Sequence, residues 1–108
     1  MKKQTIYIAG KITGLDPKEA RMNFKNAQEY IESATEFFIV KNPMQINAKQ
    51  NGHEWKDYML KDIEVLFNCN AIYMLKNWKD SKGARIEHCI AIEMNKYILY
   101  QQSEPLQI

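Results

Sequence analysis

The sequence lacks any long apolar run, and it has few of the residues that build metal sites or disulfide frameworks. No apolar stretch approaches the ~18 residues of a membrane-spanning helix, so we expect no membrane partner. With only two cysteines and two histidines, and neither C-x-x-C nor paired-histidine spacing, we expect no metal. Cys69 and Cys89 are interpreted as buried thiols of a cytoplasmic protein. The formal net charge of +2 is too small to indicate a nucleic-acid polymer as partner.

Glycine is also scarce, and neither glycine-rich phosphate motif is present. The four glycines form no G-x-G-x-x-G and no G-x-x-x-x-G-K-[ST], which argues against a dinucleotide or a P-loop site. We therefore expect no cofactor. The lysines at positions 2 and 3 precede only a strand-length apolar run, so no signal peptide is expected. The length of 108 residues predicts a single domain over residues 1–108, large enough to bury roughly 65% of its unfolded surface.

Four short apolar segments alternate with helical patterns along the chain. Strands are expected at residues 5–9, 37–40, 70–75 and 97–100, because these runs are rich in β-branched and aromatic residues. Helices are expected from Pro17, from Trp55 to Asn68, and after an N-cap at Asp80 or Ser81. Residues 44–52 show no period and are interpreted as a loop and a candidate lid. This alternation predicts a doubly wound α/β fold with a parallel sheet, strand order 2-1-3-4 and helices on both faces.

Glu87 is the first candidate for chemistry. It lies about one and a half turns into the last helix, and its neighbours on that helix face, Gly83, Ala84 and Ala91, are small. The side chain is therefore expected to point at the sheet, although an exposed carboxylate is the simpler interpretation of a helical glutamate. The positive helix end is expected to favour the ionised form, which suits a nucleophile.

Two further residues are candidates because of where they lie. Asp62 follows Tyr58 by one turn on the second long helix, and Tyr7 lies in the expected central strand. An exposed acid paired with a lysine is the alternative for Asp62. Core packing, with the hydroxyl satisfied at an edge, is the alternative for Tyr7.

Basic residues gather in or beside the loops that follow the first three expected strands. Because these loops meet at one edge of a parallel sheet, an anionic small molecule is the expected ligand there. Ser81, at a helix start, can donate to a phosphate together with the free backbone amides. The lysines concerned are Lys11, Lys41, Lys76, Lys79 and Lys82.

Five short motifs, in this order, carry a resemblance to known proteins. They are TIYIAGKITG at residues 5–14, the Asn-Pro pair at 42–43, YMLKDI at 58–63, CNAIYML at 69–75 and SKGARIE at 81–87. Together they resemble a small-domain family of unknown function. That family is similar to the nucleoside 2-deoxyribosyltransferases and the 2'-deoxynucleoside 5'-monophosphate N-glycosidases.

The resemblance implies a flavodoxin-like (Rossmann-like) fold and cleavage or transfer at the N-glycosidic bond of a deoxynucleoside or deoxynucleotide. Glu87 matches the nucleophile, Asp62 the acid that handles the base, and Tyr7 the residue that orients the nucleophile. A homo-oligomer is also implied. The substrate-binding residues are expected to be Gly10, Lys11, Ile12, Thr13, Ser81 and Gly83, with Ser81 holding the 5'-phosphate.

Two alternatives from other functional classes stay open at this stage. One is a non-catalytic nucleotide-binding module that keeps the pocket without turnover. The other is an interaction protein with no small ligand, for which Glu87 would face solvent.

Overall fold

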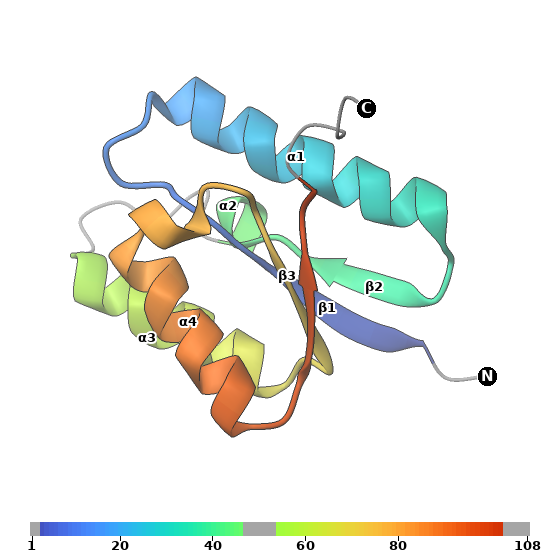
Figure 1. Ribbon diagram of the computed structural model, residues 1–108. Coiled ribbons are helices and arrows are strands. Elements are labelled where there is room, and N and C mark those ends of the chain that lie inside the picture. The colour runs from blue at the N-terminus through green and yellow to red at the C-terminus, as the bar shows by residue number, and fades with distance from the viewer. Residues whose placement is uncertain (1–2, 47–53, 103–108) are drawn as a thin grey trace, which may run out of the picture.

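The computed structural model describes residues 3–46 and 54–102 and shows a four-stranded sheet covered by helices on both faces (Figure 1). Each predicted strand is found within one residue of its expected bounds. The elements in chain order are β1 Gln4–Ala9, α1 Pro17–Ala34, β2 Phe38–Lys41, α2 Pro43–Ile46, α3 Trp55–Phe67, β3 Ala71–Met74, a 3₁₀ turn Trp78–Asp80, α4 Lys82–Glu93 and β4 Tyr97–Tyr100.

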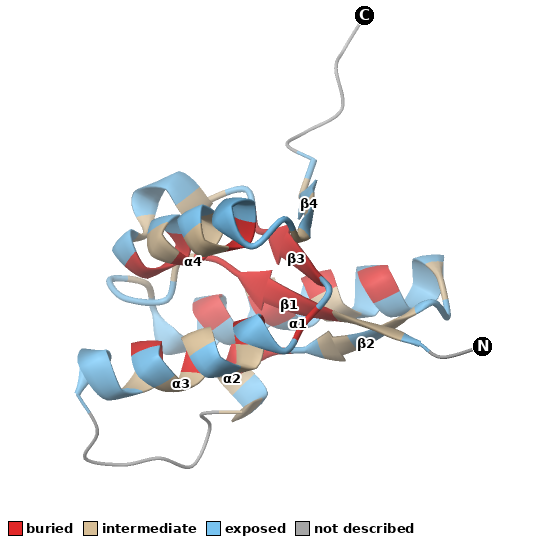
Figure 2. Cartoon of the chain, turned by 90° about the horizontal axis from the view of Figure 1, so that it is seen from below, coloured by how far each residue is buried: buried red, intermediate tan, exposed pale blue. Residues whose placement is uncertain are grey.

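The sheet is parallel throughout and its strand order is β2-β1-β3-β4, which confirms the predicted topology. Strands β1 and β3 lie in the middle and are buried, whereas β2 and β4 form partly exposed edges (Figure 2). The chain leaves β1 toward one face of the sheet and leaves β3 toward the other. The carboxyl ends of these two neighbours therefore form a topological switch point, where α/β folds bind ligands.

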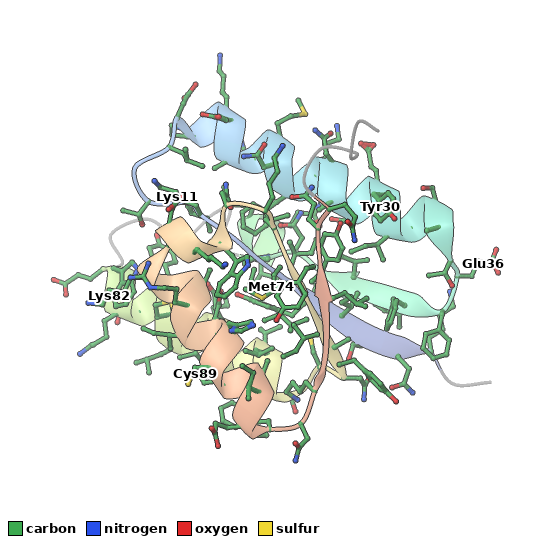
Figure 3. All side chains as sticks on the ribbon, in the orientation of Figure 1. Lys11, Tyr30, Glu36, Met74, Lys82 and Cys89 are labelled. Carbon is green, nitrogen blue, oxygen red and sulfur yellow. The ribbon has the colours of Figure 1, made fainter. Side chains whose placement is uncertain are left out.

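Each face of the sheet has its own apolar core because side chains alternate along the central strands. On one face, Ile6 and Ile8 pack with Phe24 and Ile31 of α1. On the other face, Tyr7 and Ala9 pack with Leu66 of α3 and with Ala84 and Ala91 of α4. Figure 3 shows Met74 inside the molecule and the charged Lys11, Glu36 and Lys82 at its periphery. In the described part of the chain, no helix has the length and apolarity to cross a membrane.

The expected loop at residues 44–52 is wrong in its first part, because Pro43–Ile46 forms the short helix α2. Asn42 starts this turn: its side-chain Oδ1 accepts from the Met44 amide at 2.9 Å, and its carbonyl accepts from the amides of Gln45 and Ile46. The Asn42 amide group in turn donates to Gln28 of α1 at 3.1 Å. The rest of the candidate lid, residues 47–52, lies outside the described residues.

One of the two cysteines is also not where the sequence suggested. Cys69 is buried between α3 and β3, but Cys89 is exposed on α4. Residue 89 lies two positions after the buried Glu87, so the helical period turns it away from the sheet. The description of both cysteines as buried thiols is therefore wrong for Cys89.

Gly10 permits a close contact at the end of β1. An added Cβ at this position would lie 2.4 Å from Cδ1 of the buried Leu75. We expect Gly10→Ala to lower the free energy of unfolding by about 1–3 kcal/mol, as overpacking of a filled core does. Urea unfolding of the single variants and of the double variant with Leu75→Ala would test this. Strictly additive losses would contradict the steric explanation, because relief of a clash makes the double variant lose less than the sum.

Candidate active site

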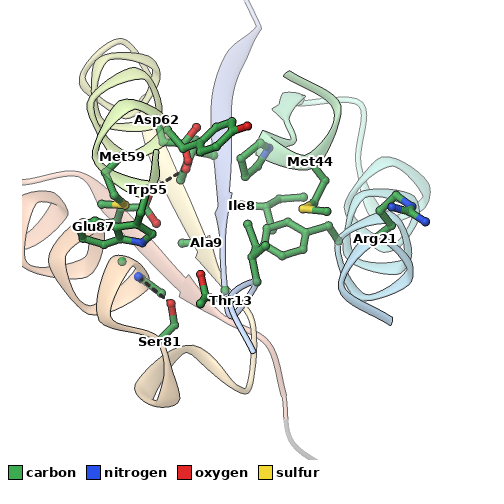
Figure 4. A pocket seen from close by; sticks show the side chains of 18 of the residues that line it. Ile8, Ala9, Thr13, Arg21, Met44, Trp55, Met59, Asp62, Ser81 and Glu87 are labelled. Carbon is green, nitrogen blue, oxygen red and sulfur yellow. Dashed lines mark hydrogen bonds between the residues drawn. The ribbon is translucent and has the colours of Figure 1, made fainter. Parts of the chain in front are cut away.

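A pocket of about 620 Å³ lies at the carboxyl end of β1, at the switch point of the sheet (Figure 4). Its walls come from β1, the loop that follows it, and helices α1, α2, α3 and α4. Asp62, Glu87 and Ser81 lie on one side of β1, while Met44 and Arg21 lie on the other. The pocket therefore reaches across both faces of the sheet, with its acids on the side of α3 and α4.

Tyr7 and Glu87 meet inside this pocket although they are 80 residues apart in the chain. The Tyr7 hydroxyl donates to Oε2 of Glu87 at 2.6 Å, and both residues are buried, with 1% and 4% of their surface exposed. Strand alternation turns Tyr7 toward α4, and the small Ala84 and Ala91 let α4 approach the sheet closely. Glu87 does not face solvent, so the placement that would have pointed to an interaction protein without a small ligand is not found.

Burial raises the pKa of Glu87 to about 8. The hydrogen bond from Tyr7 lowers this pKa, and the negative charge of Asp62 raises it further. The helix end was expected to favour the ionised form of Glu87, but burial outweighs that effect. A helix dipole stabilises a negative charge by only ~0.3–1 kcal/mol within the first turn. A rise of a single pKa unit already corresponds to ~1.4 kcal/mol against the charged form. Burial of Tyr7, with the charges of Glu87 and Asp62, also raises the pKa of the phenol, so Tyr7 remains a donor.

Asp62 is the second acid of the pocket. It is buried on α3, with 6% of its surface exposed, rather than lying on the outer face of the helix. Tyr58, one turn earlier on the same helix, also lines the pocket. The negative charge of Asp62 disfavours a second negative charge on Glu87.

The structure brings most of the predicted site residues to this one pocket. Tyr7, Asp62 and Glu87 line it, and so do Gly10, Ile12, Thr13, Ser81 and Gly83. Lys11 does not line it; its backbone amide instead donates to Oδ1 of Asn77 at 3.0 Å. The role of each residue in binding or catalysis stays a prediction.

The lysine cluster expected around the ligand is not at the pocket. None of the five lysines named above lines it, and Lys82 lies with Nζ 5.1 Å from the ring centroid of Trp55. Among the described residues that line the pocket, Arg21 is the only lysine or arginine. Arg21 was not among the residues predicted for the site, although its spacing from Pro17 and Phe24 places all three on one face of α1.

Ser81 and Gly83, the two site residues predicted at the start of α4, each contact another part of the protein. Ser81 is the N-cap, and its Oγ accepts from the Ala84 amide at 3.1 Å, so its own proton remains for a ligand. Gly83 lines the pocket but does not simply leave room for a ligand. An added Cβ there would lie 2.9 Å from Sδ of Met59, so the missing side chain lets α3 approach α4.

The profile of a domain of unknown function, DUF4406, matches residues 4–100. The chain belongs to this family. The fold of this DUF4406 chain is similar to that of a 2-desoxiribosyltransferase from Leishmania mexicana, with a TM-score of 0.65 and 21% sequence identity. The match covers 94% of the DUF4406 chain and 65% of the transferase, so the chain spans less than two thirds of that protein's length. No curated protein matches the sequence.

This likeness confirms the flavodoxin-like fold of the DUF4406 chain and the predicted resemblance to the deoxyribosyltransferases. In chemical terms, the pocket offers a carboxyl group held by a phenol and a second acid beside it. Those groups suit substitution at a carbon that carries a leaving group in need of a proton. Within residues 3–46 and 54–102, no three His, Cys, Asp or Glu side chains are grouped so that they could hold a metal ion.

Proposed function

We propose that this DUF4406 domain cleaves or transfers at the N-glycosidic bond of a 2'-deoxynucleoside or its 5'-monophosphate, with Glu87 as nucleophile. The observation that carries the proposal is the buried hydrogen bond between Tyr7 and Glu87 in a pocket that also contains Asp62. Similarity in fold to a protein titled a 2-desoxiribosyltransferase supports the same class of reaction.

In the first step, a Glu87 oxygen forms a bond to the anomeric carbon as the bond from that carbon to the base nitrogen breaks. The electron pair of the broken bond goes to the base, and Asp62 supplies the proton that makes it a neutral leaving group. The sugar is then held as an ester of Glu87, as in retaining glycosidases. Tyr7 holds Oε2, so Oε1 is the oxygen left to face the sugar.

In the second step, water or another base attacks the anomeric carbon and releases Glu87 as a carboxylate. Asp62 accepts the proton of the attacking group, which restores the starting state. A carboxylate is favoured when positive charge develops on the sugar, because opposite charges attract strongly in a buried site. The raised pKa of Glu87 in the empty pocket means that its proton must leave before the attack; transfer of that proton to Asp62 gives both the carboxylate nucleophile and the acid that the first step needs.

Base release is the direct test of this proposal. The protein would be incubated with each common deoxynucleoside and its 5'-monophosphate, and free base would be separated by chromatography. We expect release from at least one substrate. The absence of release from all of them, both alone and with a second free base added as acceptor, would overturn the proposal. Thermal stabilisation by nucleotides without product, unchanged in Glu87→Ala, would instead support the non-catalytic binding module.

We further propose that Ser81 contacts the 5'-phosphate, and Ser81→Asp tests this role. Aspartate is as good an N-cap as serine, but its charge repels a phosphate. We expect KM for the monophosphate to rise by about tenfold or more, equivalent to ~1.4 kcal/mol, with little change for the free nucleoside. Steady-state kinetics on the two matched substrates measure the difference. An equal loss for both substrates would contradict a phosphate contact.

The predicted homo-oligomer and the predicted cytoplasmic location stay predictions. So does the absence of a cofactor. The proposed chemistry needs only the side chains of Glu87, Asp62 and Tyr7 together with water or an acceptor base.

A further inference from the structure

A second, smaller hollow lies beyond the carboxyl ends of β3 and β4, on the face of the sheet that α1 covers. Its volume is about 170 Å³. It is lined by Asn23 and Asn26 of α1, by Leu75, Lys76 and Asn77 after β3, and by Gln101 after β4. Its lining among the described residues is rich in carboxamides and contains no aspartate or glutamate.

Two of these carboxamides have their orientation fixed by the backbone. Oδ1 of Asn77 accepts from the Lys11 amide at 3.0 Å, and Oε1 of Gln101 accepts from the Lys76 amide at 2.9 Å. Only the oxygen of a carboxamide can accept a hydrogen bond from a backbone N–H. The NH₂ groups of Asn77 and Gln101 therefore remain as donors. Lys76, an exposed residue at the rim, brings a positive charge to a hollow whose described lining residues include no acid.

We propose that this hollow binds a small oxyanion, either free phosphate or the phosphate or carboxylate group of a metabolite. Such groups only accept hydrogen bonds, and charged acceptors form the stronger bonds with amide and ammonium donors. The volume of about 170 Å³ has room for such a group together with several water molecules, since one water molecule takes about 30 Å³ of liquid. Neutral ligands with donors of their own would leave the NH₂ groups unmatched.

The hollow shares a wall with the larger pocket. Leu75 packs against Gly10, and Asn77 holds the amide of Lys11. Both Leu75 and Asn77 line the hollow, while Gly10 and the loop after it line the larger pocket. An anion bound by Asn77 would therefore contact a residue that fixes the position of the active-site loop. Binding itself does not depend on the proposed reaction.

Titration of the full chain with inorganic phosphate, and separately with acetate, tests the proposal at constant ionic strength. We expect saturable shifts of the side-chain NH₂ signals of Asn77 and Gln101 in ¹H–¹⁵N spectra. Lys76→Gln should weaken the affinity by about tenfold, since hydrogen bonds to charged groups contribute ~1.5–3 kcal/mol. Lys79→Gln is the matched control, because Lys79 is exposed and lines neither pocket; it should bind as the wild type does.

Saturation by phosphate alone would assign a phosphate group, and saturation by acetate alone a carboxylate. Saturation by both would assign a general oxyanion site. The absence of saturable shifts with either anion would overturn the proposal, and so would an unchanged affinity in Lys76→Gln. Because the measurement is made without substrate, a failure to release base would not alter its result.

Discussion

Glu87→Gln should reduce base release by roughly 1,000-fold or more, which is the scale on which loss of a nucleophile lowers turnover. The amide oxygen of glutamine can still accept from the Tyr7 hydroxyl, so the geometry at 2.6 Å is expected to persist. What is lost is the negatively charged oxygen that attacks the sugar in the proposed mechanism. Release rates with saturating substrate, together with nucleotide binding by calorimetry, measure the two effects separately.

Glu93→Gln is the matched control for this variant. Glu93 lies at the end of the same helix and is exposed, so its replacement should leave release unchanged. A rate for Glu87→Gln within about tenfold of wild type would rule out the nucleophilic role, because ~1.4 kcal/mol is far less than a lost covalent step requires.

Glu87 should also make the wild type less stable as the pH rises. Its pKa is about 8 in the folded protein and 4.5 as the reference value, so between these values the folded state retains a proton that the unfolded state has lost. Stability then falls by ~1.4 kcal/mol per pH unit as the pH increases through that window. Below the lower pKa this group no longer changes stability with pH.

Urea unfolding of wild type and Glu87→Gln between pH 5 and pH 8 would test this second prediction. The lower limit lies about half a pH unit above the reference pKa of 4.5, and the upper limit lies at the folded-state pKa of about 8. Glutamine cannot ionise, so the difference between the two proteins isolates Glu87 from all other titrating groups. We expect Glu87→Gln to gain stability relative to the wild type as the pH rises, by several kcal/mol across the range. Parallel curves would show that Glu87 is as accessible to water as a surface carboxylate.

The fold could be predicted because its determinants are local. The apolar run of β1 marks a central strand, and Asp16 with Pro17 marks the start of α1. In contrast, α2 has only four residues, too few to show a helical period. Its start depends on Asn42, whose contact with Gln28 joins segments that the sequence does not place together.

The site was predictable where it depended on strand alternation and helix spacing. Those two periods place Tyr7 and Glu87 on facing surfaces. The protonation of Glu87 was not predictable, because burial and the charge of Asp62 depend on how α3 packs against α4. The five loop lysines were wrongly expected at the ligand for a related reason. The position of a residue in a loop does not determine where the charged group at the end of a long side chain lies. Arg21, on a helix, therefore lines the pocket and the loop lysines do not.

Gly83 has a consequence for how this site could vary among related chains. The two acids are carried by different helices, and the distance of closest approach of those helices depends on a position that has no side chain. A methyl group there would lie 2.9 Å from the Met59 sulfur, so the Met59 side chain, which lines the same pocket, would have to move. A substitution at this one position would therefore change the shape of the pocket while every ionisable residue stays the same.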